Sequence, residues 1–307
     1  MTSPARRGAT ARRAALLAPE FLAKLERLAL LAHRPVRGWA AGQRRSRRSG
    51  HSVEFNDYRP YGAGDDPRYI DWNIYGRSDR LYVKLFVDDE DLSLHLLVDA
   101  SASMQWGEPS KLDWSAKLAA ALGFVGLAGQ ERVGLGLLRE RASEGWAPGR
   151  GRARIPRLID TLGGAEARGQ TTLNVALAGY AARLRGGGVA VVISDLLDPQ
   201  GYEAGLQALL ERQVDVHLIH VLAPDELDPA QRAELRGDLR LTDSETGEVR
   251  LISVDAGALA RYRVRLAAFL ERAEQFCRSH SIVYQRAASD SPVEDLVLGP
   301  LRGKLLA

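Results

Sequence analysis

A carboxylate and two hydroxyls stand at alternate positions directly after one apolar run of the sequence. Residues 94–98 predict a buried strand, and Asp99, Ser101 and Ser103 follow it. Oxygen ligands of this kind suit Mg²⁺, which takes about six oxygens near 2.1 Å and usually keeps some waters. The alternative is that the same side chains only form a turn and cap the next helix. The stretch by itself does not decide between the two.

Two later segments carry oxygen side chains to comparable positions. Residues 189–193 form the most strand-like run of the chain and end in Ser194 and Asp195, while Thr171 precedes a helix. Because ligands bind outside the carboxyl ends of parallel strands, we expect these segments to meet at one edge of a sheet. Separate caps do not explain such convergence, so a metal site is favoured. Its expected ligands are Asp99, Ser101, Ser103, Thr171 and Asp195, and its expected ion is Mg²⁺, with Mn²⁺ or Ca²⁺ as alternatives.

Strands and helices alternate along the chain from residue 92 onward, which predicts a doubly wound, mostly parallel α/β sheet flanked by helices. We expect strands at 92–98, 132–138, 189–193, 214–222 and 282–286. We expect helices at 110–128, 155–162, about 172–184, 201–212 and 256–279. Residues 224–253 interrupt this alternation and predict a short helix to 235 followed by a β-hairpin. Residues 81–87 predict a strand that forms a hairpin with 92–98, and 139–154 shows no clear pattern.

Residues 51–86 form a second informative stretch, since they hold eight of the 20 aromatic residues of the chain. Charges of both signs alternate with the rings, and no single helical or strand period covers the stretch. We expect an irregular segment held by aromatic stacking and Arg–carboxylate pairs. A second metal site is the less favoured alternative for its acidic residues. The candidate partner-binding residues of this stretch are Asp65, Asp66, Arg68, Asp71 and Trp72.

Charge is distributed unevenly along the chain, although its net charge is only +3. Residues 1–50 carry 12 Lys/Arg against two Asp/Glu, so the rest of the chain is net acidic. We expect disorder over 1–15, an amphipathic helix over 19–31, and a basic cluster over 43–50. That cluster could contact nucleic acid, anionic lipid or an acidic partner. A solvated loop is the favoured interpretation.

Other global features predict a cytoplasmic protein. No apolar run of about 18 residues and no secretory signal is present, and the single cysteine, Cys277, excludes an intrachain disulfide. Cys277 lies on an apolar helical face and is expected to be buried. The expected organisation is a basic arm and helix over 1–37, an aromatic and charged segment over 38–87, an α/β domain over 88–287, and a docking tail over 288–307.

The pattern Asp99-x-Ser101-x-Ser103, then Thr171, then Asp195, resembles the von Willebrand factor A domain and its metal-ion-dependent adhesion site. In that family the first Asp and both Ser bind the metal from one loop, a Thr follows on a second loop, and the last Asp often acts through water. Residues 169–177 look like the family's Gly-Gly-Thr run into a helix, with Gln170 in place of the second Gly. Thr172 is the alternative to Thr171.

A second set of motifs narrows the resemblance. Glu54-Phe-x-Asp57-Tyr-Arg-x-Tyr61, Gly64-Asp-Asp-Pro-Arg68 and Ile70-Asp-Trp72 resemble the bacterial "domain of unknown function 58" family, over about residues 38–287. That family carries such a segment before a von Willebrand A-like domain. The resemblance implies a partnership with MoxR-type AAA+ ATPases in assembly or maturation of protein complexes. Many members have N-terminal membrane spans, whereas none is found in this sequence.

Three functions compete. The first is a non-enzymatic interaction module whose Mg²⁺ accepts a carboxylate from a partner. The second is a Mg²⁺-dependent phosphohydrolase that uses Asp99. We find no general base beside the site, although His95 precedes Asp99 by four residues on the same predicted strand. A Walker A sequence, a G-x-G-x-x-G fingerprint and an H-E-x-x-H motif are also absent from the sequence. The third is nucleic-acid or lipid-surface binding through residues 1–50.

Overall fold

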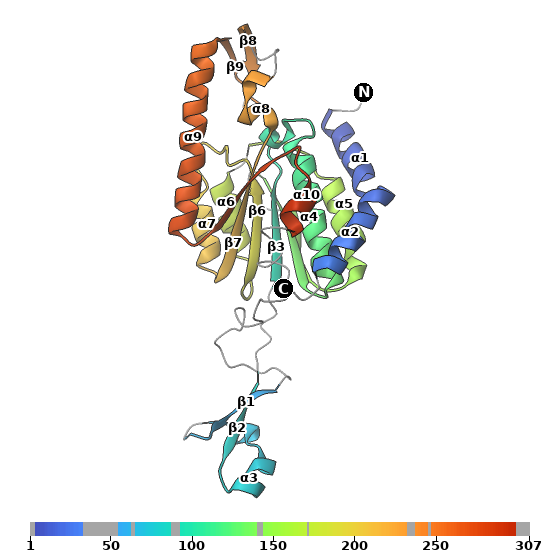
Figure 1. Ribbon diagram of the computed structural model, residues 1–307, viewed down its shortest axis with the longest axis vertical. Coiled ribbons are helices and arrows are strands. Elements are labelled where there is room, and N and C mark those ends of the chain that lie inside the picture. The colour runs from blue at the N-terminus through green and yellow to red at the C-terminus, as the bar shows by residue number, and fades with distance from the viewer. Residues whose placement is uncertain are drawn as a thin grey trace. The chain divides into compact units, whose positions relative to one another are not determined.

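The chain divides into two compact units in the computed structural model (Figure 1). The larger, the α/β body, comprises residues 1–34 with 93–307, and the smaller, the aromatic unit, comprises 35–92. The structure describes residues 4–32, 55–62, 65–86, 93–139, 144–170, 172–231, 237–244 and 247–298. None of the helices in these ranges is both long and apolar enough to cross a membrane.

A six-stranded sheet forms the centre of the α/β body, in the order β10-β7-β6-β3-β4-β5. All neighbouring pairs are parallel except β4–β5. The strands are β3 (Ser93–Asp99), β4 (Arg132–Leu138), β5 (Glu144–Gly149), β6 (Gly188–Ser194), β7 (Val214–Leu222) and β10 (Val283–Ala288). The chain passes from β3 to β4 on one side and later returns to β6 on the other. The predicted doubly wound fold is therefore confirmed, and its switch point lies between β3 and β6.

Helices cover both faces of this sheet (Figure 1). One face carries α1 (Pro4–Leu16), α2 (Pro19–Ala32), α4 (Lys111–Ala128), α5 (Ile155–Gly163) and α10 (Val293–Leu298). The other carries α6 (Leu173–Ala181), α7 (Glu203–Leu210) and α9 (Ala256–Ser279). The central strands are buried on both sides, which explains why their sequences are continuous apolar runs rather than alternating ones.

Helix α4 packs closely against the sheet because of its sequence. Ser110 caps it by accepting a hydrogen bond from the amide of Asp113 at 3.1 Å, as the capping pattern predicts. Gly123 lies where a Cβ atom would come within 2.6 Å of the Leu158 side chain and 3.0 Å of Leu96. The small residue lets α4 approach both α5 and β3, so the first residue of α4, Lys111, is placed firmly at the carboxyl edge of the sheet.

The N-terminal segment is helical, so the expectation of disorder over residues 1–15 is wrong from Pro4 onward. In α1, Arg12 is 3% exposed and donates hydrogen bonds to Asp113, at 2.6 Å, and to the carbonyl of Ala165. Leu16 is fully buried in the same core as α4. These partners lie more than 100 residues away in the sequence, and a local compositional pattern cannot reveal them.

Two strand assignments also need correction. The 81–87 strand, β2 (Tyr82–Phe86), pairs with β1 (Phe55–Pro60) rather than with β3. Both edges of β3 are already occupied by β4 and β6, so no hairpin partner fits there. The segment 139–154, for which no clear prediction was made from the sequence, contains the antiparallel edge strand β5. Its sequence, EGWAPG, lacks the apolar pattern of a strand. Glycine and proline are tolerated there because an edge strand needs fewer ladder bonds.

The predicted insertion is present as two short helices and a hairpin. They are α8 (Pro224–Leu227), η4 (Pro229–Gln231), β8 (Gly237–Thr242) and β9 (Val249–Val254). The expected helix to 235 is shorter than predicted within the described residues. Two further short turns are η2 (Ala102–Gln105) and η3 (Arg152–Arg154). In the part of the C-terminal tail that the structure describes, α10 packs on the body through Val293, Leu296 and Val297, which are buried. The rest of the predicted docking tail, from residue 299, lies outside the described residues.

The aromatic unit contains β1, η1 (Pro67–Tyr69), α3 (Trp72–Ser78) and β2. It is more regular than expected, because Asp71 caps α3 by accepting hydrogen bonds from the amides of Asn73 and Ile74, at 2.9 and 3.3 Å. The amide of Asp71 bonds to the carbonyl of Tyr82 at 2.9 Å, so the helix start is fixed to the small sheet.

Candidate functional site

The loop after β3 brings its polar side chains together. Asp99 is 1% exposed, and its Oδ1 accepts a hydrogen bond from the amide of Ser101 at 2.9 Å. The hydroxyls of Ser101 and Ser103 lie 3.0 Å apart and share a hydrogen bond. Ser101 has an extended backbone and caps a short 3-10 turn that begins at Ala102, so the change of direction between the two serines brings their hydroxyls together. The predicted cluster of oxygens is therefore formed locally.

The end of β6 lies directly beside this loop. The hydroxyl of Ser194 donates to Oδ2 of Asp99 at 2.6 Å, so both oxygens of Asp99 accept hydrogen bonds. The next residue, Asp195, is also 1% exposed, and its Oδ1 accepts from the amide of Leu197 at 3.1 Å. Leu196, between them, has φ 58°, an uncommon backbone conformation for leucine that costs about 1 kcal/mol or more. The turn that positions Asp195 is thus held by its own side-chain bonds.

Thr171 lies outside the described residues, but the chain on both sides of it is bonded to the other two arms of the site. The amide of Arg168 donates to the carbonyl of Ala100, and the amide of Ala102 donates to the carbonyl of Gly169, each at 3.0 Å. After Thr171, the amide of Leu173 donates to Asp198 at 2.6 Å. The described residues before Thr171 are therefore bonded to the β3 loop, and those after it to the β6 loop.

Lys111 is a member of this site that the sequence analysis missed. Its side chain is fully buried, and its ammonium lies 2.7 Å from Oδ2 of Asp195 and 2.5 Å from Oε1 of Glu226. Glu226 belongs to α8, at the start of the insertion, and also accepts from the amide of Ala223 at 2.7 Å. A signal was available in the sequence: a lysine at the first position of a helix is unfavourable beside the positive end of the helix dipole unless carboxylates surround it.

Burial controls the electrostatics of these groups. Burial, and then the nearby charge of Asp195, raise the pKa of Asp99 to about 6. Burial alone would lower the pKa of Lys111, but Asp195 and Glu226 together raise it above its ordinary value. Burial also raises the pKa of Glu226, and Lys111 only partly offsets that effect. An ionised lysine therefore compensates one of the two buried carboxylates contributed by the strand ends.

The donor set fits a hard cation in its chemistry. Two serine hydroxyls and two buried carboxylates are oxygen ligands of the kind that Mg²⁺ selects. Each carboxylate oxygen has a second lone pair, so the hydrogen bonds from Ser194 and Lys111 do not exhaust its capacity. Within the described ranges, no group of three or more His, Cys, Asp or Glu side chains is placed to hold a metal. Any cation here would depend on the hydroxyls of Ser101 and Ser103.

Two histidines of the central strands, His95 and His220, are not placed to act as a general base beside Asp99. His95 lies four residues before Asp99, about 13 Å along the strand, and its Nδ1 shares a hydrogen bond with the hydroxyl of Tyr180 at 2.9 Å. His220 is nearer, but its Nε2 bonds to the carbonyl of Asp195 and its Nδ1 to the hydroxyl of Tyr284. Chiefly through burial, the pKa of each histidine is lowered to about 4.

In the aromatic unit, most candidate partner-binding residues have structural partners. Asp65 pairs with Arg59 at 2.7 Å, and Asp66 with Arg68 at 2.7 Å, which confirms the predicted Arg–carboxylate pairs. Asp71, 4% exposed, is a helix cap that also accepts from the hydroxyl of Tyr58 at 3.1 Å. Trp72 differs from these, because it is 63% exposed and touches the edge of Tyr75. Trp72 is thus the one apolar residue among the five candidates, and most of its side chain is accessible.

Comparison with other proteins gives the same family assignment as the motifs. A family model described as "Protein of unknown function DUF58" matches residues 57–274. Uncharacterized proteins of Mycobacterium bovis and Mycobacterium tuberculosis are each 33% identical over 245 residues, which is 77% of this chain and 75% of theirs.

Solved structures show weaker similarity. An aerotolerance-related membrane protein from Bacteroides fragilis has a TM-score of 0.42 at 15% identity, over 67% of this chain and 94% of that one. The VWA domain of SpRpn10 has a TM-score of 0.37 at 13% identity, over 70% and 99%.

Proposed function

Because the chain belongs to the DUF58 family, we propose that it is a non-enzymatic protein-interaction module whose working site is the carboxyl edge of the sheet. One observation carries the proposal: the hydroxyls of Ser101 and Ser103, 3.0 Å apart, stand beside two carboxylates that are almost fully buried. Buried carboxylates are costly unless they bind a cation or a strong donor. The site is therefore suited to bind a metal cation, and that cation is suited to bind a carboxylate of a partner.

In this proposal Asp99, Ser101, Ser103, Thr171 and Asp195 would hold Mg²⁺. The ion, when bound, would supply a positive centre that accepts an Asp or Glu carboxylate of a partner protein. Ser194 holds Asp99 in place through its 2.6 Å hydrogen bond. Lys111 neutralises Asp195 and so reduces the net negative charge of the site, which favours the approach of an incoming carboxylate.

The partner that we propose is a MoxR-type AAA+ ATPase or its client protein, in assembly or maturation of a protein complex. Support for this partner comes from the resemblance of the family motifs. The exposed Trp72, with Arg68, offers a further contact surface in the aromatic unit, since exposed aromatic and arginine side chains are frequent anchors of interfaces.

Direct titration with Mn²⁺, followed by electron paramagnetic resonance, tests the metal. The wild-type chain should bind one ion, and the double variant Ser101→Ala/Ser103→Ala should bind it at least tenfold more weakly. Ser78→Ala is the matched control, since this exposed hydroxyl bonds only within α3 in the described structure. Equal Mn²⁺ affinity in the wild type and the double variant would contradict the proposed ligand set.

Recovery of the companion ATPase with and without EDTA tests the bridge. We expect EDTA and Asp99→Ala each to abolish recovery. Lys111 raises a specific alternative, because a buried ammonium already lies on Asp195 and could hold the site without a metal. Recovery that survives EDTA but fails in a Lys111→Met/Glu226→Gln protein shown to be folded would assign the site to the lysine. Recovery that survives EDTA and is normal in Asp99→Ala would reject the metal bridge.

The described residues do not favour the other two functions. Both nitrogens of His220 are engaged, so a base for phosphoester hydrolysis is not offered by this residue. In the basic N-terminal segment, Arg12 and Arg13 pair with Asp113 and Asp160 rather than facing a nucleic acid or lipid. The basic cluster 43–50 lies outside the described residues.

A further inference from the structure

Four exposed apolar side chains belong to the segments that form the candidate metal site, one on each segment. They are Trp106 directly after η2, Val175 in the first turn of α6, Leu197 in the loop after β6 and Leu227 at the end of α8, with exposed fractions of 47, 52, 46 and 39%. Each follows a member of the site by no more than four residues; these members are Ser103, Thr171, Asp195 and Glu226. Single exposed hydrophobic residues are ordinary, whereas a set gathered about one site commonly marks an interaction surface. We name these four side chains the apolar rim.

Trp106 is fastened between two members of the site. Its amide donates to the carbonyl of Ser103 at 3.1 Å, and its carbonyl accepts from the amide of Lys111 at 3.0 Å. In the described part of the chain, its indole makes no hydrogen bond, ring contact or cation–π contact. The fold thus fixes the backbone of Trp106 and leaves its ring accessible to a partner.

Leu197 is placed by the turn that also holds Asp195. Its amide donates to Oδ1 of Asp195 at 3.1 Å. The preceding Leu196 has φ 58° and is 2% exposed, so the first leucine of the pair is buried in the core and the second is exposed to solvent. A polar side chain at position 197 would keep the backbone bond to Asp195. The turn therefore does not require an apolar residue there.

The other two members of the apolar rim lie on helices at the same edge of the sheet. Val175 is in the first turn of α6, and helical side chains lean toward the N-terminus of their helix, which here is at the carboxyl edge. Leu227 follows Glu226, whose carboxylate pairs with the ammonium of Lys111. These two residues therefore extend the apolar rim onto α6 and α8.

An apolar rim strengthens an ionic contact at its centre. Apolar side chains of a partner that pack on the rim would exclude water from the site, and the attraction between a cation and a carboxylate is stronger where water is excluded. The residues that dominate protein interfaces are enriched in Trp and are surrounded by contacts that keep water out. Trp106 offers the largest side chain of the rim and a backbone that is bonded on both sides.

We propose that the apolar rim selects partner segments in which the metal-binding Asp or Glu is flanked by large apolar residues, with Trp106 as the main anchor. The inference rests on the proposed function, because it assigns the neighbours of the carboxylate that Mg²⁺ would accept. An acidic residue with small polar neighbours would bind more weakly, since it would leave the rim in contact with water.

Three synthetic peptides test the proposal: acetyl-Gly-Leu-Asp-Leu-Gly-amide, its Ser-Asp-Ser counterpart and its Leu-Asn-Leu counterpart. Their affinities for the full chain are measured by saturation-transfer NMR titration in Mg²⁺ and again in EDTA. In Mg²⁺ the Leu-Asp-Leu peptide should bind about tenfold more tightly than either counterpart.

The outcomes separate the apolar rim from the metal bridge. Equal affinity of the Leu-Asp-Leu and Ser-Asp-Ser peptides in Mg²⁺, with loss of both in EDTA, would keep the bridge and overturn the rim. A preference for Leu-Asp-Leu over both counterparts that persists in EDTA would keep the rim and count against the bridge. Equal binding of the Leu-Asn-Leu peptide, or no binding of any peptide, would overturn the proposal.

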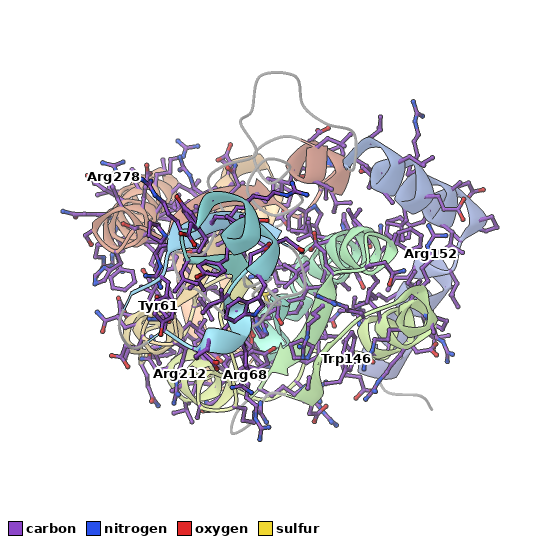
Figure 2. All side chains as sticks on the ribbon, turned by 90° about the horizontal axis from the view of Figure 1, so that it is seen from below. Tyr61, Arg68, Trp146, Arg152, Arg212 and Arg278 are labelled. Carbon is purple, nitrogen blue, oxygen red and sulfur yellow. The ribbon has the colours of Figure 1, made fainter. Side chains whose placement is uncertain are left out.

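Variants locate the binding. Trp106→Ala and Leu197→Ser should each weaken binding of the Leu-Asp-Leu peptide about fivefold or more. Leu30→Ala, at a 72% exposed position of α2, is the apolar control and should not change it. Arg212→Ala is a second control, since Arg212 is exposed and precedes β7 at the opposite edge of the sheet, which Figure 2 shows from below. Unchanged affinity in Trp106→Ala, Leu197→Ser and their double variant would place the peptide elsewhere and reject the rim.

Discussion

The hydroxyl of Ser194, at the end of β6, donates a 2.6 Å hydrogen bond to the carboxylate of Asp99, at the end of β3. The two residues are 95 positions apart in the sequence and end adjacent parallel strands. This bond joins the two halves of the sheet at the point where the strand order reverses. Both residues are almost fully buried, so the bond is protected from competition by water.

Replacing Ser194 should therefore destabilise the fold. In Ser194→Ala the buried carboxylate of Asp99 loses one of its donors, and a hydrogen bond to a charged group is worth about 1.5–3 kcal/mol. Urea unfolding should report a loss of this size. Ser78→Ala, which removes an exposed hydroxyl in α3, should change stability by less than about 0.5 kcal/mol. Equal stability of the two variants would contradict the importance of the Ser194 bond.

Lys111→Met should destabilise the α/β body more strongly. Without the ammonium, Asp195 and Glu226 are left as uncompensated carboxylates, and breaking a buried ion pair from one side costs about 3–5 kcal/mol. The double variant Lys111→Met/Glu226→Gln should recover part of that loss, since one of the orphaned charges is gone. Lys117→Met on the same helix is the control. A Lys111→Met protein as stable as the control would contradict the compensation of Asp195 and Glu226 by Lys111.

Arg12 and Arg13 provide a matched pair of ion pairs in one helix. Arg12 pairs with Asp113 with its side chain 2% exposed, whereas the pair between Arg13 and Asp160 is more than half exposed on both sides. Arg12→Leu should cost about 3–5 kcal/mol and detach α1, while Arg13→Leu should cost less than about 1 kcal/mol. Unfolding curves, together with limited proteolysis of the first 16 residues, would measure both effects. Comparable losses in the two variants would contradict the buried role of Arg12.

His95 should make stability depend on pH. Its pKa is lowered from 6.5 to about 4 in the folded protein by burial and by Arg132. As the pH falls below 6.5, the unfolded chain takes up a proton that the folded chain does not, so stability is lost between pH 6.5 and 4. The contribution of His95 should be about 2 kcal/mol smaller at pH 5 than at pH 7. Urea unfolding of the wild type and of His95→Asn at pH 5 and at pH 7 isolates the contribution of His95 to stability. An identical pH dependence of the two proteins would contradict it.

Much of the fold follows from local patterns. The bounds of α4, β4, β7 and α9 agree with their predicted ranges, since each has a strong apolar pattern and a clear cap or break at its ends. The edge strand β5 was missed because glycine and proline obscure its pattern. The helix α1 was missed because its stability comes from Arg12 and Leu16, whose partners lie on distant segments.

The sequence by itself determined the loop of Asp99, Ser101 and Ser103 and the strand ends at Asp99 and Asp195, because spacing within a few residues and strand polarity are local properties. Only the tertiary structure decided which groups meet there. Lys111 reaches Asp195 across 84 residues, and Ser194 reaches Asp99 across 95. The physical reason is that charge compensation in a buried site depends on distances in space, which strand order and helix packing set.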